Sequence, residues 1–197
     1  MQNIKKIEEK FNIEVYGQKM PVMINIDKPR GFPKVLNLFG CKVGAEIGVN
    51  KGRFSKWMCH KIRPLKLFLV DPYKSYKEYS EYLDQNEMDS IYAEAQERVK
   101  RYDCEFVKKA SMDALKDFND ESLDFVYIDG NHAYQYVLDD IRGWSKKVKV
   151  GGIVSGHDYS PYHFKNVVKA VDQYIKENNI RVWYRTKNSN WFFVKEE

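Results

Sequence analysis

The sequence predicts an α/β protein with a Rossmann-like, mostly parallel sheet, helices on both faces and a C-terminal antiparallel hairpin. Three observations predict this fold: short apolar runs alternate with helical stretches, the turns after the runs carry Gly or Asp, and the last two apolar runs are separated by only five polar residues. Most runs lack strict alternation of apolar and polar residues, as expected of strands covered on both faces. The predicted parallel strands are residues 43–47, 67–70, 104–108, 123–128 and 152–155.

The part of the chain before the first of these strands lacks the regular alternation. Residues 4–12 carry apolar side chains at helical spacing, and prolines and glycines then divide residues 20–40 into extended and turn pieces. No repeat, low-complexity tract or Gly/Ser linker marks a domain boundary. We therefore predict a single domain over residues 1–197, made of an N-terminal cap (1–40) and an α/β core (41–197).

Helices are expected between and after the strands. The most regular one runs from Phe164 to Ile175, where apolar side chains follow the i, i+3, i+4, i+7 pattern. The insert at 73–102 carries tyrosines at every third position from Tyr73 to Tyr82; we interpret them as a packing surface, with an acceptor lid or a dimer surface as alternatives. The remaining predicted elements are helices at 52–62, 111–118 and 134–148, and hairpin strands at 181–185 and 191–194.

Composition narrows the possible partners. The chain has 33 Lys and Arg against 28 Asp and Glu, and this excess of positive charge is spread along the sequence. It favours an anionic ligand but predicts no nucleic-acid partner. The apolar stretches fall well short of the roughly 18 residues that a membrane helix needs, and the first ten residues contain no apolar signal region. We expect a cytoplasmic protein without a membrane partner.

A glycine turn follows the first predicted strand. Its spacing is E-x-G-x-x-x-G, from Glu46 through Gly48 to Gly52. Glycine permits a tight turn and a close approach of the backbone to a ligand, and an acidic side chain can accept hydrogen bonds from a ligand's ammonium group. The motif is neither the dinucleotide-binding G-x-G-x-x-G nor a phosphate loop. Packing of strand against helix is an equally good explanation of the glycines.

Two further segments follow the next strands along the chain. Asp71 ends the second predicted strand, where a carboxylate can accept the hydroxyls of a ribose. It can also cap a helix that begins at Pro72. Ser111 and Met112 follow the third strand and are expected at the same carboxyl edge of the sheet, where open α/β folds bind ligands. They fit a helix start equally well.

The strongest signal is a set of ionisable side chains at the ends of the last two parallel strands. Asp129 and His132 follow one strand, and His157 and Asp158 follow the next. Oxygen and imidazole ligands suit a divalent cation, and a histidine can act as a general base near neutral pH. Four such groups at one edge are difficult to explain by packing alone, because crowding or burying them requires compensation.

With these motifs together, the sequence resembles the class I S-adenosylmethionine-dependent methyltransferases, and among them the macrocin O-methyltransferase-like branch that acts on small molecules and sugars. The resemblance covers roughly residues 40–195. It implies that the glycine motif holds the methionine part of the cofactor, that Asp71 binds ribose, and that Ser111 and Met112 meet adenine. The motifs are AEIGVNKGRFS, LFLVDPY, LDFVYIDGNHAYQYVLDDI and GGIVSGHDY, and the implied cofactor residues are Glu46, Gly48, Asn50, Gly52, Asp71, Ser111, Met112 and Asp129.

Metal-dependent members of the family also resemble catechol O-methyltransferase in their site. This resemblance implies that Asp129, His157 and Asp158 ligate a divalent metal, magnesium or manganese, and that His132 with Asp129 performs the catalysis, His132 as the base. His157 stands where magnesium-binding members usually have a carboxylate, which leaves a softer metal, or none, open. The implied reaction is O-methylation of a small hydroxylated acceptor, a sugar among the candidates.

Three rival functions remain open at this point. A nicotinamide oxidoreductase could use the same sheet, although its glycine motif is missing. A non-haem metal oxygenase could use His132, His157 and a carboxylate as a facial triad on iron. A binding module could keep the cofactor pocket without catalysis, and the aromatic insert is compatible with a homo-oligomer.

Overall fold

The computed structural model describes residues 2–26, 31–75 and 84–196. Within these residues the chain forms eight strands and seven α-helices, with a short 3-10 helix at Leu115–Asp117. The strands are β1 (Val22–Ile24), β2 (Val43–Ile47), β3 (Lys66–Val70), β4 (Cys104–Val107), β5 (Leu123–Ile128), β6 (Val148–Gly156), β7 (Tyr184–Thr186) and β8 (Trp191–Val194). The helices are α1 (Gln2–Phe11), α2 (Pro33–Leu38), α3 (Arg53–Lys61), α4 (Gln85–Val99), α5 (Ser111–Ala114), α6 (Tyr134–Lys147) and α7 (Lys165–Glu177).

All the strands join one sheet in the order β1-β7-β8-β6-β5-β2-β3-β4. Neighbouring strands are parallel except at β8, which runs antiparallel to both β6 and β7. This confirms the predicted mostly parallel sheet with a closing antiparallel hairpin. Strands β2 and β5 have the predicted bounds, whereas β6 begins four residues earlier than predicted, at Val148.

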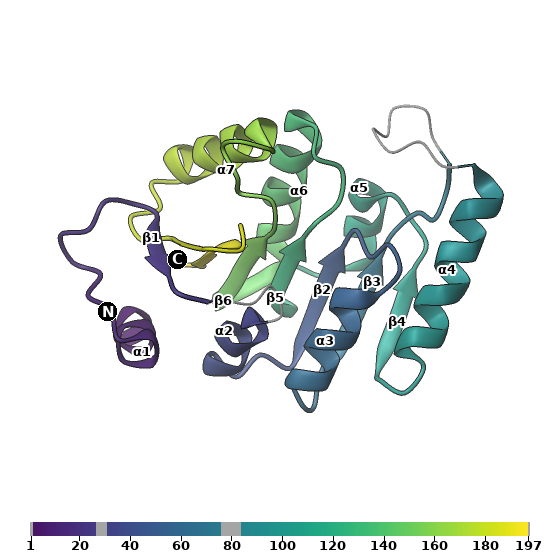
Figure 1. Cartoon of the computed structure of the whole chain (residues 1–197), viewed down its shortest axis with the longest axis horizontal. Coiled ribbons are helices and arrows are strands. Elements are labelled where there is room, and N and C mark those ends of the chain that lie inside the picture. The colour runs from purple at the N-terminus through teal and green to yellow at the C-terminus, as the bar shows by residue number, and fades with distance from the viewer. Residues whose placement is uncertain (1, 27–30, 76–83, 197) are drawn as a thin grey trace.

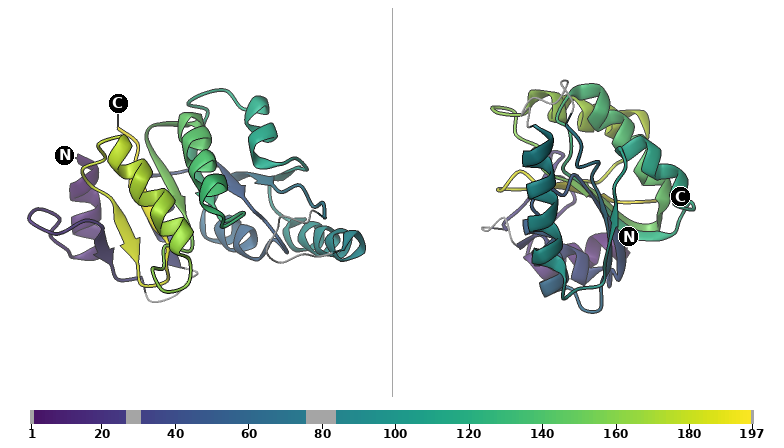
Figure 2. Two further views of the ribbon diagram at one scale, coloured as in Figure 1. Left: turned by 90° about the horizontal axis from the view of Figure 1, so that it is seen from above. Right: turned by 90° about the vertical axis from the view of Figure 1, so that its right-hand side faces the viewer.

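Helices cover both faces of the sheet, and a separate hydrophobic core fills each interface (Figures 1 and 2). One core includes Phe32 and Met58 and lies under α1 to α4. The other includes Trp144 and Val171 and lies under α5 to α7. Because β2 and β5 are covered on both faces, their apolar runs show no clean alternation.

The N-terminal segment does more than cap the core. Strand β1 pairs in parallel with β7, with Val22 opposite Tyr184, so the segment predicted only as a cap supplies the edge strand of the sheet. Pro33, which the sequence analysis treated as a breaker, instead begins α2. The first turn of a helix tolerates proline because the missing N–H would have no intrahelical partner there.

The second half of the 73–102 insert forms α4, the crossover between β3 and β4. Asp84 and Glu87 form a capping box at its N-terminus, and Ala95 and Val99 are buried on its inner side. Helix α4 is therefore part of the packed fold. Of the tyrosines interpreted as a packing surface, Tyr73 is buried. Of the tyrosine series, Tyr76, Tyr79 and Tyr82 lie outside the described residues. No helix in the described segments combines the length and the apolar character that crossing a membrane requires.

Candidate functional site

The carboxyl ends of β2, β3, β5 and β6 lie along one edge of the sheet, where β5 and β3 flank β2 (Figure 1). The predicted site residues in the segments that follow these strands are therefore neighbours in space. Ligands of open α/β sheets bind at this edge. Two groups of contacts build the site: one around the turn after β2, and one around the ends of β5 and β6.

The turn after β2 is held by close backbone packing. Gly48 has φ +85°, and its N–H donates to the carbonyl of Val70 at 2.9 Å. A Cβ atom at Gly48 would lie 2.2 Å from the carbonyl oxygen of Asp129. The packing explanation for this glycine is thus sufficient, because any side chain would displace the loop after β5. Gly52, also at positive φ, caps the N-terminus of α3.

The carboxylate of Asp71 ties two loops together. One oxygen accepts hydrogen bonds from the N–H groups of Val49 and Asn50, at 2.9 and 3.1 Å. The other accepts from the N–H of Tyr73 at 2.9 Å. The Tyr73 hydroxyl donates back to the carbonyl of Asn50 at 2.9 Å. Sequence reasoning did not single out this role for Tyr73, because its partner lies 23 residues away across the sheet edge.

Glu46 points into the molecule beneath the turn. Its side chain is buried at 2% exposure and accepts a hydrogen bond from the Ser55 hydroxyl on α3. Burial raises the pKa of Glu46 well above its usual range, and the Ser55 hydrogen bond only partly offsets this effect. The side chain therefore braces β2 against α3.

After β4, Ser111 lies toward α6 and Met112 is 48% exposed. The Ser111 hydroxyl donates to Oδ1 of Asp140 and accepts from Nε1 of Trp144, the latter at 2.8 Å. Asp140 is buried, and burial raises its pKa to about 7. Sequence reasoning missed Asp140, because its partner is on another helix.

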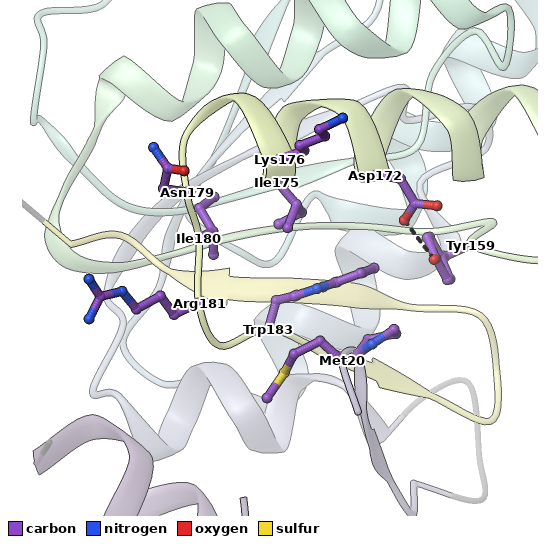
Figure 3. A pocket seen from close by; sticks show the side chains of 10 residues that line it. Met20, Tyr159, Asp172, Ile175, Lys176, Asn179, Ile180, Arg181 and Trp183 are labelled. Carbon is purple, nitrogen blue, oxygen red and sulfur yellow. Dashed lines mark hydrogen bonds between the residues drawn. The ribbon is translucent and has the colours of Figure 1, made fainter. Parts of the chain in front are cut away.

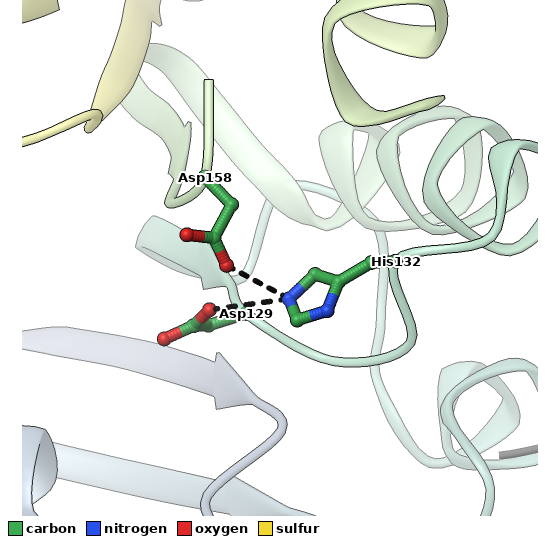
Figure 4. A group of neighbouring side chains, drawn as sticks. All are labelled: Asp129, His132 and Asp158. Carbon is green, nitrogen blue, oxygen red and sulfur yellow. Dashed lines mark ion pairs between the residues drawn. The ribbon is translucent and has the colours of Figure 1, made fainter. Parts of the chain in front are cut away.

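Two histidines flank two carboxylates at the ends of β5 and β6. Figure 4 shows one of them, His132, with Asp129 and Asp158. His132 Nε2 lies 2.8 Å from Oδ2 of Asp158 and 3.9 Å from Oδ1 of Asp129. On the other side, His157 Nδ1 lies 2.9 Å from Oδ1 of Asp158 and 4.0 Å from Oδ1 of Asp129. Asp158 has φ 60°, an uncommon backbone conformation that directs its carboxylate between the rings.

The charges of this group shift one another's pKa values. The carboxylates of Asp129 and Asp158 raise the pKa of His132 to about 9. Burial alone would lower the pKa of His157, but the hydrogen bond to Asp158 and the nearby negative charges outweigh it and raise that pKa. The two histidines hold the pKa of Asp158 well below its usual range despite its burial. His132 is thus an imidazolium at neutral pH, whereas a base must be neutral.

The group has the composition of a divalent-cation site. Atoms of Asp129, His132 and Asp158 that could ligate a metal lie within 4.8 Å of one another. Among the described residues, the buried Nε2 of His132 has no well-aligned hydrogen bond despite its short distance to Asp158. A cavity of about 10 Å³ lies among Asp129, His132 and His157, close to the volume that one water molecule needs. These donors fit a metal, and the converging group contains His132 rather than the predicted His157.

A larger cavity of about 790 Å³ lies elsewhere, between the end of α7 and the segment that leads into β7 (Figure 3). Trp183 and Tyr159 form its inner wall, and the Tyr159 hydroxyl donates to Asp172 at 2.8 Å. None of the predicted site residues lines it. The larger cavity and the predicted site residues therefore lie in different parts of the molecule.

Comparison with known proteins adds an independent observation. A family model described as "Methyltransferase domain" matches residues 45–159. No curated protein matches the chain in sequence. In fold, the chain is similar to the O-methyltransferase NovP, with a TM-score of 0.61, 19% identity, and coverage of 85% of this chain and 78% of that one.

Two other solved structures are similar over nearly the whole chain. One is the O-methyltransferase TomG from Streptomyces achromogenes, in complex with SAM, with a TM-score of 0.59, 13% identity, and coverage of 98% and 88%. The other is a putative caffeoyl-CoA O-methyltransferase from Staphylococcus aureus, with a TM-score of 0.62, 13% identity, and coverage of 98% and 91%. These similarities show the fold.

Proposed function

This chain belongs to the methyltransferase domain family and has the fold of class I S-adenosylmethionine-dependent methyltransferases. We therefore propose that it transfers a methyl group to a hydroxyl oxygen of a small molecule or sugar. The observation that carries the proposal is His132, which lies between two carboxylates at the same sheet edge as the glycine turn and Asp71. Family membership favours this reaction over the oxidoreductase and oxygenase alternatives. The proposal includes a cytoplasmic location and leaves a homo-oligomer open.

The cofactor half of the proposed site comprises the turn after β2, Asp71, and the start of α5. Asp71 already holds the loops with both oxygens, yet a carboxylate has about four acceptor positions, so it can still accept a ribose hydroxyl. Exposed Met112 offers an apolar surface to the adenine ring. When bound, S-adenosylmethionine supplies the electrophilic methyl group. The backbone turn at 48–52 would orient its methionine part.

The reaction half would remove the acceptor's proton. We assign this role to Nε2 of His132, whose ring packs against Phe164 with 4.8 Å between ring centroids. Asp158 and Asp129 fix the ring but also hold its proton, so His132 becomes an effective base only when its pKa falls from about 9. Additional positive charge near the two carboxylates would lower it.

The near-symmetric placement of the histidines suggests a division of roles. Asp129, Asp158 and His157 would hold a magnesium or manganese ion, and His132 would remain available as the base. Such an ion would supply Lewis-acid stabilisation of the acceptor oxygen. A histidine cannot ligate through the same nitrogen that accepts a proton, so the two roles require different histidines.

A methyl-transfer assay tests the proposal. Chelator-treated protein would be incubated with S-adenosylmethionine labelled in its methyl group and with a panel of sugars, phenols and other small hydroxylated molecules. The assay would be run without metal, with magnesium and with manganese. We expect label in at least one acceptor, as an alkali-stable ether. Cofactor binding without transfer to any acceptor would favour the binding-module alternative, and transfer to nitrogen or carbon would contradict O-methylation.

A further inference from the structure

Two cysteines that are distant in sequence lie in contact, away from the proposed chemistry. Cys59 is on α3 and Cys104 is the first residue of β4, yet their Sγ atoms are 3.5 Å apart. Two sulfurs at this distance need to approach by only about 1.5 Å to form a disulfide bond. Cys104 pairs with Leu67 near the start of β3, so the two sulfurs lie toward the amino edge of the sheet, opposite the edge that carries Asp71.

The two thiols differ in exposure and in acidity. Cys59 is 3% exposed, whereas Cys104 is only partly buried, on a strand at the end of the sheet. The hydrogen bond between the sulfurs lowers the pKa of Cys104, and the same bond together with burial raises the pKa of Cys59. The thiolate is the reactive form of cysteine. An oxidant should therefore react first with Cys104, and Cys59 is in place to react next.

The third cysteine lacks these features. Cys41 is 3% exposed and has no cysteine partner among the described residues, and its Sγ lies 3.9 Å from the carbonyl oxygen of Asp124. Burial raises the pKa of Cys41 to about 12. A thiol that is both buried and protonated is unreactive. Cys41 is therefore an internal reference for the other two.

We propose that Cys59 and Cys104 are a redox modification site, which a small disulfide such as oxidised glutathione converts into an intramolecular disulfide. The Cys104 thiolate attacks one sulfur of oxidised glutathione and releases one glutathione thiolate. The Cys59 sulfur then loses its proton, attacks the Cys104 sulfur of the mixed disulfide and releases the second glutathione. Both cysteines are thereby oxidised, and one molecule of oxidised glutathione is reduced to two of glutathione.

The cross-link would stabilise the fold by restricting the unfolded chain. It joins residues with a sequence separation of 45 and encloses β3 and α4 in the loop. A cross-link over such a loop removes conformations from the unfolded ensemble. We expect oxidation to raise the urea midpoint of unfolding by about 1 M, and reduction with dithiothreitol to reverse the change.

Oxidation of the native protein tests the proposal. Reduced protein would be incubated with oxidised glutathione at pH 8, quenched, denatured and alkylated before its mass is measured. The wild type should lose two hydrogen atoms and keep one alkylated thiol of its three, which peptide mapping should place at Cys41. Cys41→Ser is the matched control and should form the same disulfide. Cys59→Ser should stop at a glutathione adduct on Cys104, and Cys104→Ser should keep both of its thiols.

The contrary results are equally distinct. Three alkylated thiols in the treated wild type, a persistent glutathione adduct on Cys104, or a disulfide that includes Cys41 would each overturn the proposal. Peptide mapping of the wild type decides among these results even where a variant fails to fold. A disulfide between Cys59 and Cys104 that leaves the urea midpoint unchanged, or lowers it, would overturn the stabilising role of the cross-link.

Discussion

The two halves of the sheet edge differ in how completely their polar groups are paired. In the β2–β3 half, Asp71 and Tyr73 tie the loops with ordinary hydrogen bonds to backbone groups. In the β5–β6 half, two histidines compete for Asp158 and Asp129. The buried Nδ2 of Asn131 and Nε2 of His132 also lack well-aligned partners among the described residues. The first half is organised before any ligand arrives, whereas the second retains unmet polar and charged groups.

The difference indicates which property of the protein a substitution in each half should change. A preorganised loop binds its ligand without a large reordering cost, so its residues should affect affinity and stability. A cluster of mutually shifted charges is suited to moving a proton, so its residues should affect turnover. The following predictions are ordered from the largest expected effect to the smallest.

Replacement of the proposed base should have the largest effect. His132→Asn should lower kcat by about 10²- to 10⁴-fold, the usual contribution of general base catalysis, and leave the affinity for S-adenosylhomocysteine within about threefold. Turnover and calorimetry would be measured on the same preparation. His163→Asn is the control, because His163 is an exposed histidine in the loop before α7. An unchanged kcat in the His132 variant would refute the base assignment.

Asp140 should make stability depend on pH. Its pKa is about 7 in the folded protein and 3.8 ordinarily, so the folded chain binds the extra proton between these values. The resulting stabilisation is full below about pH 4 and is lost as the pH rises through 7. From pH 5 to 8 the free energy of unfolding should fall by about 2–3 kcal/mol more in the wild type than in Asp140→Asn.

Urea unfolding at both pH values provides the measurement. Asp89→Asn should follow the wild type, because this exposed carboxylate on α4 accepts from Gln85 at 2.8 Å and is not among the groups that shift the pKa of Asp140. Parallel pH dependence of the wild type and Asp140→Asn would show that the acid is not perturbed by burial.

Replacement of Asp71, which links the loops after β2 and β3, should weaken cofactor binding. Asp71→Asn replaces a carboxylate that accepts three backbone N–H groups with an amide that has one acceptor oxygen. We expect the affinity for S-adenosylhomocysteine to fall about 10- to 100-fold, the cost of losing one or two charge-assisted hydrogen bonds. Asp103→Asn, an exposed partner of Lys66, is the control. Wild-type affinity in the Asp71 variant would mean that this half does not bind the cofactor.

Tyr73→Phe should have the smallest effect. It removes only the hydroxyl that donates to Asn50 and should lower the free energy of unfolding by about 1 kcal/mol. Tyr92→Phe is the matched control, since its ring packs on Tyr73 at 4.7 Å and its hydroxyl accepts from exposed Gln96. Equal losses in the two variants would show that the hydroxyl of Tyr73 is not a specific tie.

The sequence predicts those features that depend on local patterns. Strands β2 and β5 are mostly apolar runs. Asp71 and Asp129 directly follow strand ends and Asp158 lies two residues after one, so their placement at one edge follows from parallel topology. Strand β1 could not be predicted in the same way, because it has three residues and its partner β7 lies about 160 positions away. Helix α4 carries few buried residues, which weakens its periodic signal.

The site residues that sequence reasoning missed all act through long-range contacts. Tyr73 reaches Asn50, Asp140 reaches Ser111, and neither pairing has a local spacing rule. The four charged side chains were predicted as a group, but the pKa of His132 near 9 depends on distances to carboxylates on two different strands. Such a shift follows only from geometry.

The most direct test of the comparison is calorimetric titration of chelator-treated wild-type protein with S-adenosylhomocysteine, beside NAD, and repeated with magnesium and with manganese. If the β2–β3 half is organised before any ligand arrives, S-adenosylhomocysteine should bind saturably without metal, with an affinity that either metal changes by less than about threefold, and NAD should give no heat. Absence of binding under every metal condition, or saturable binding of NAD in its place, would contradict the account.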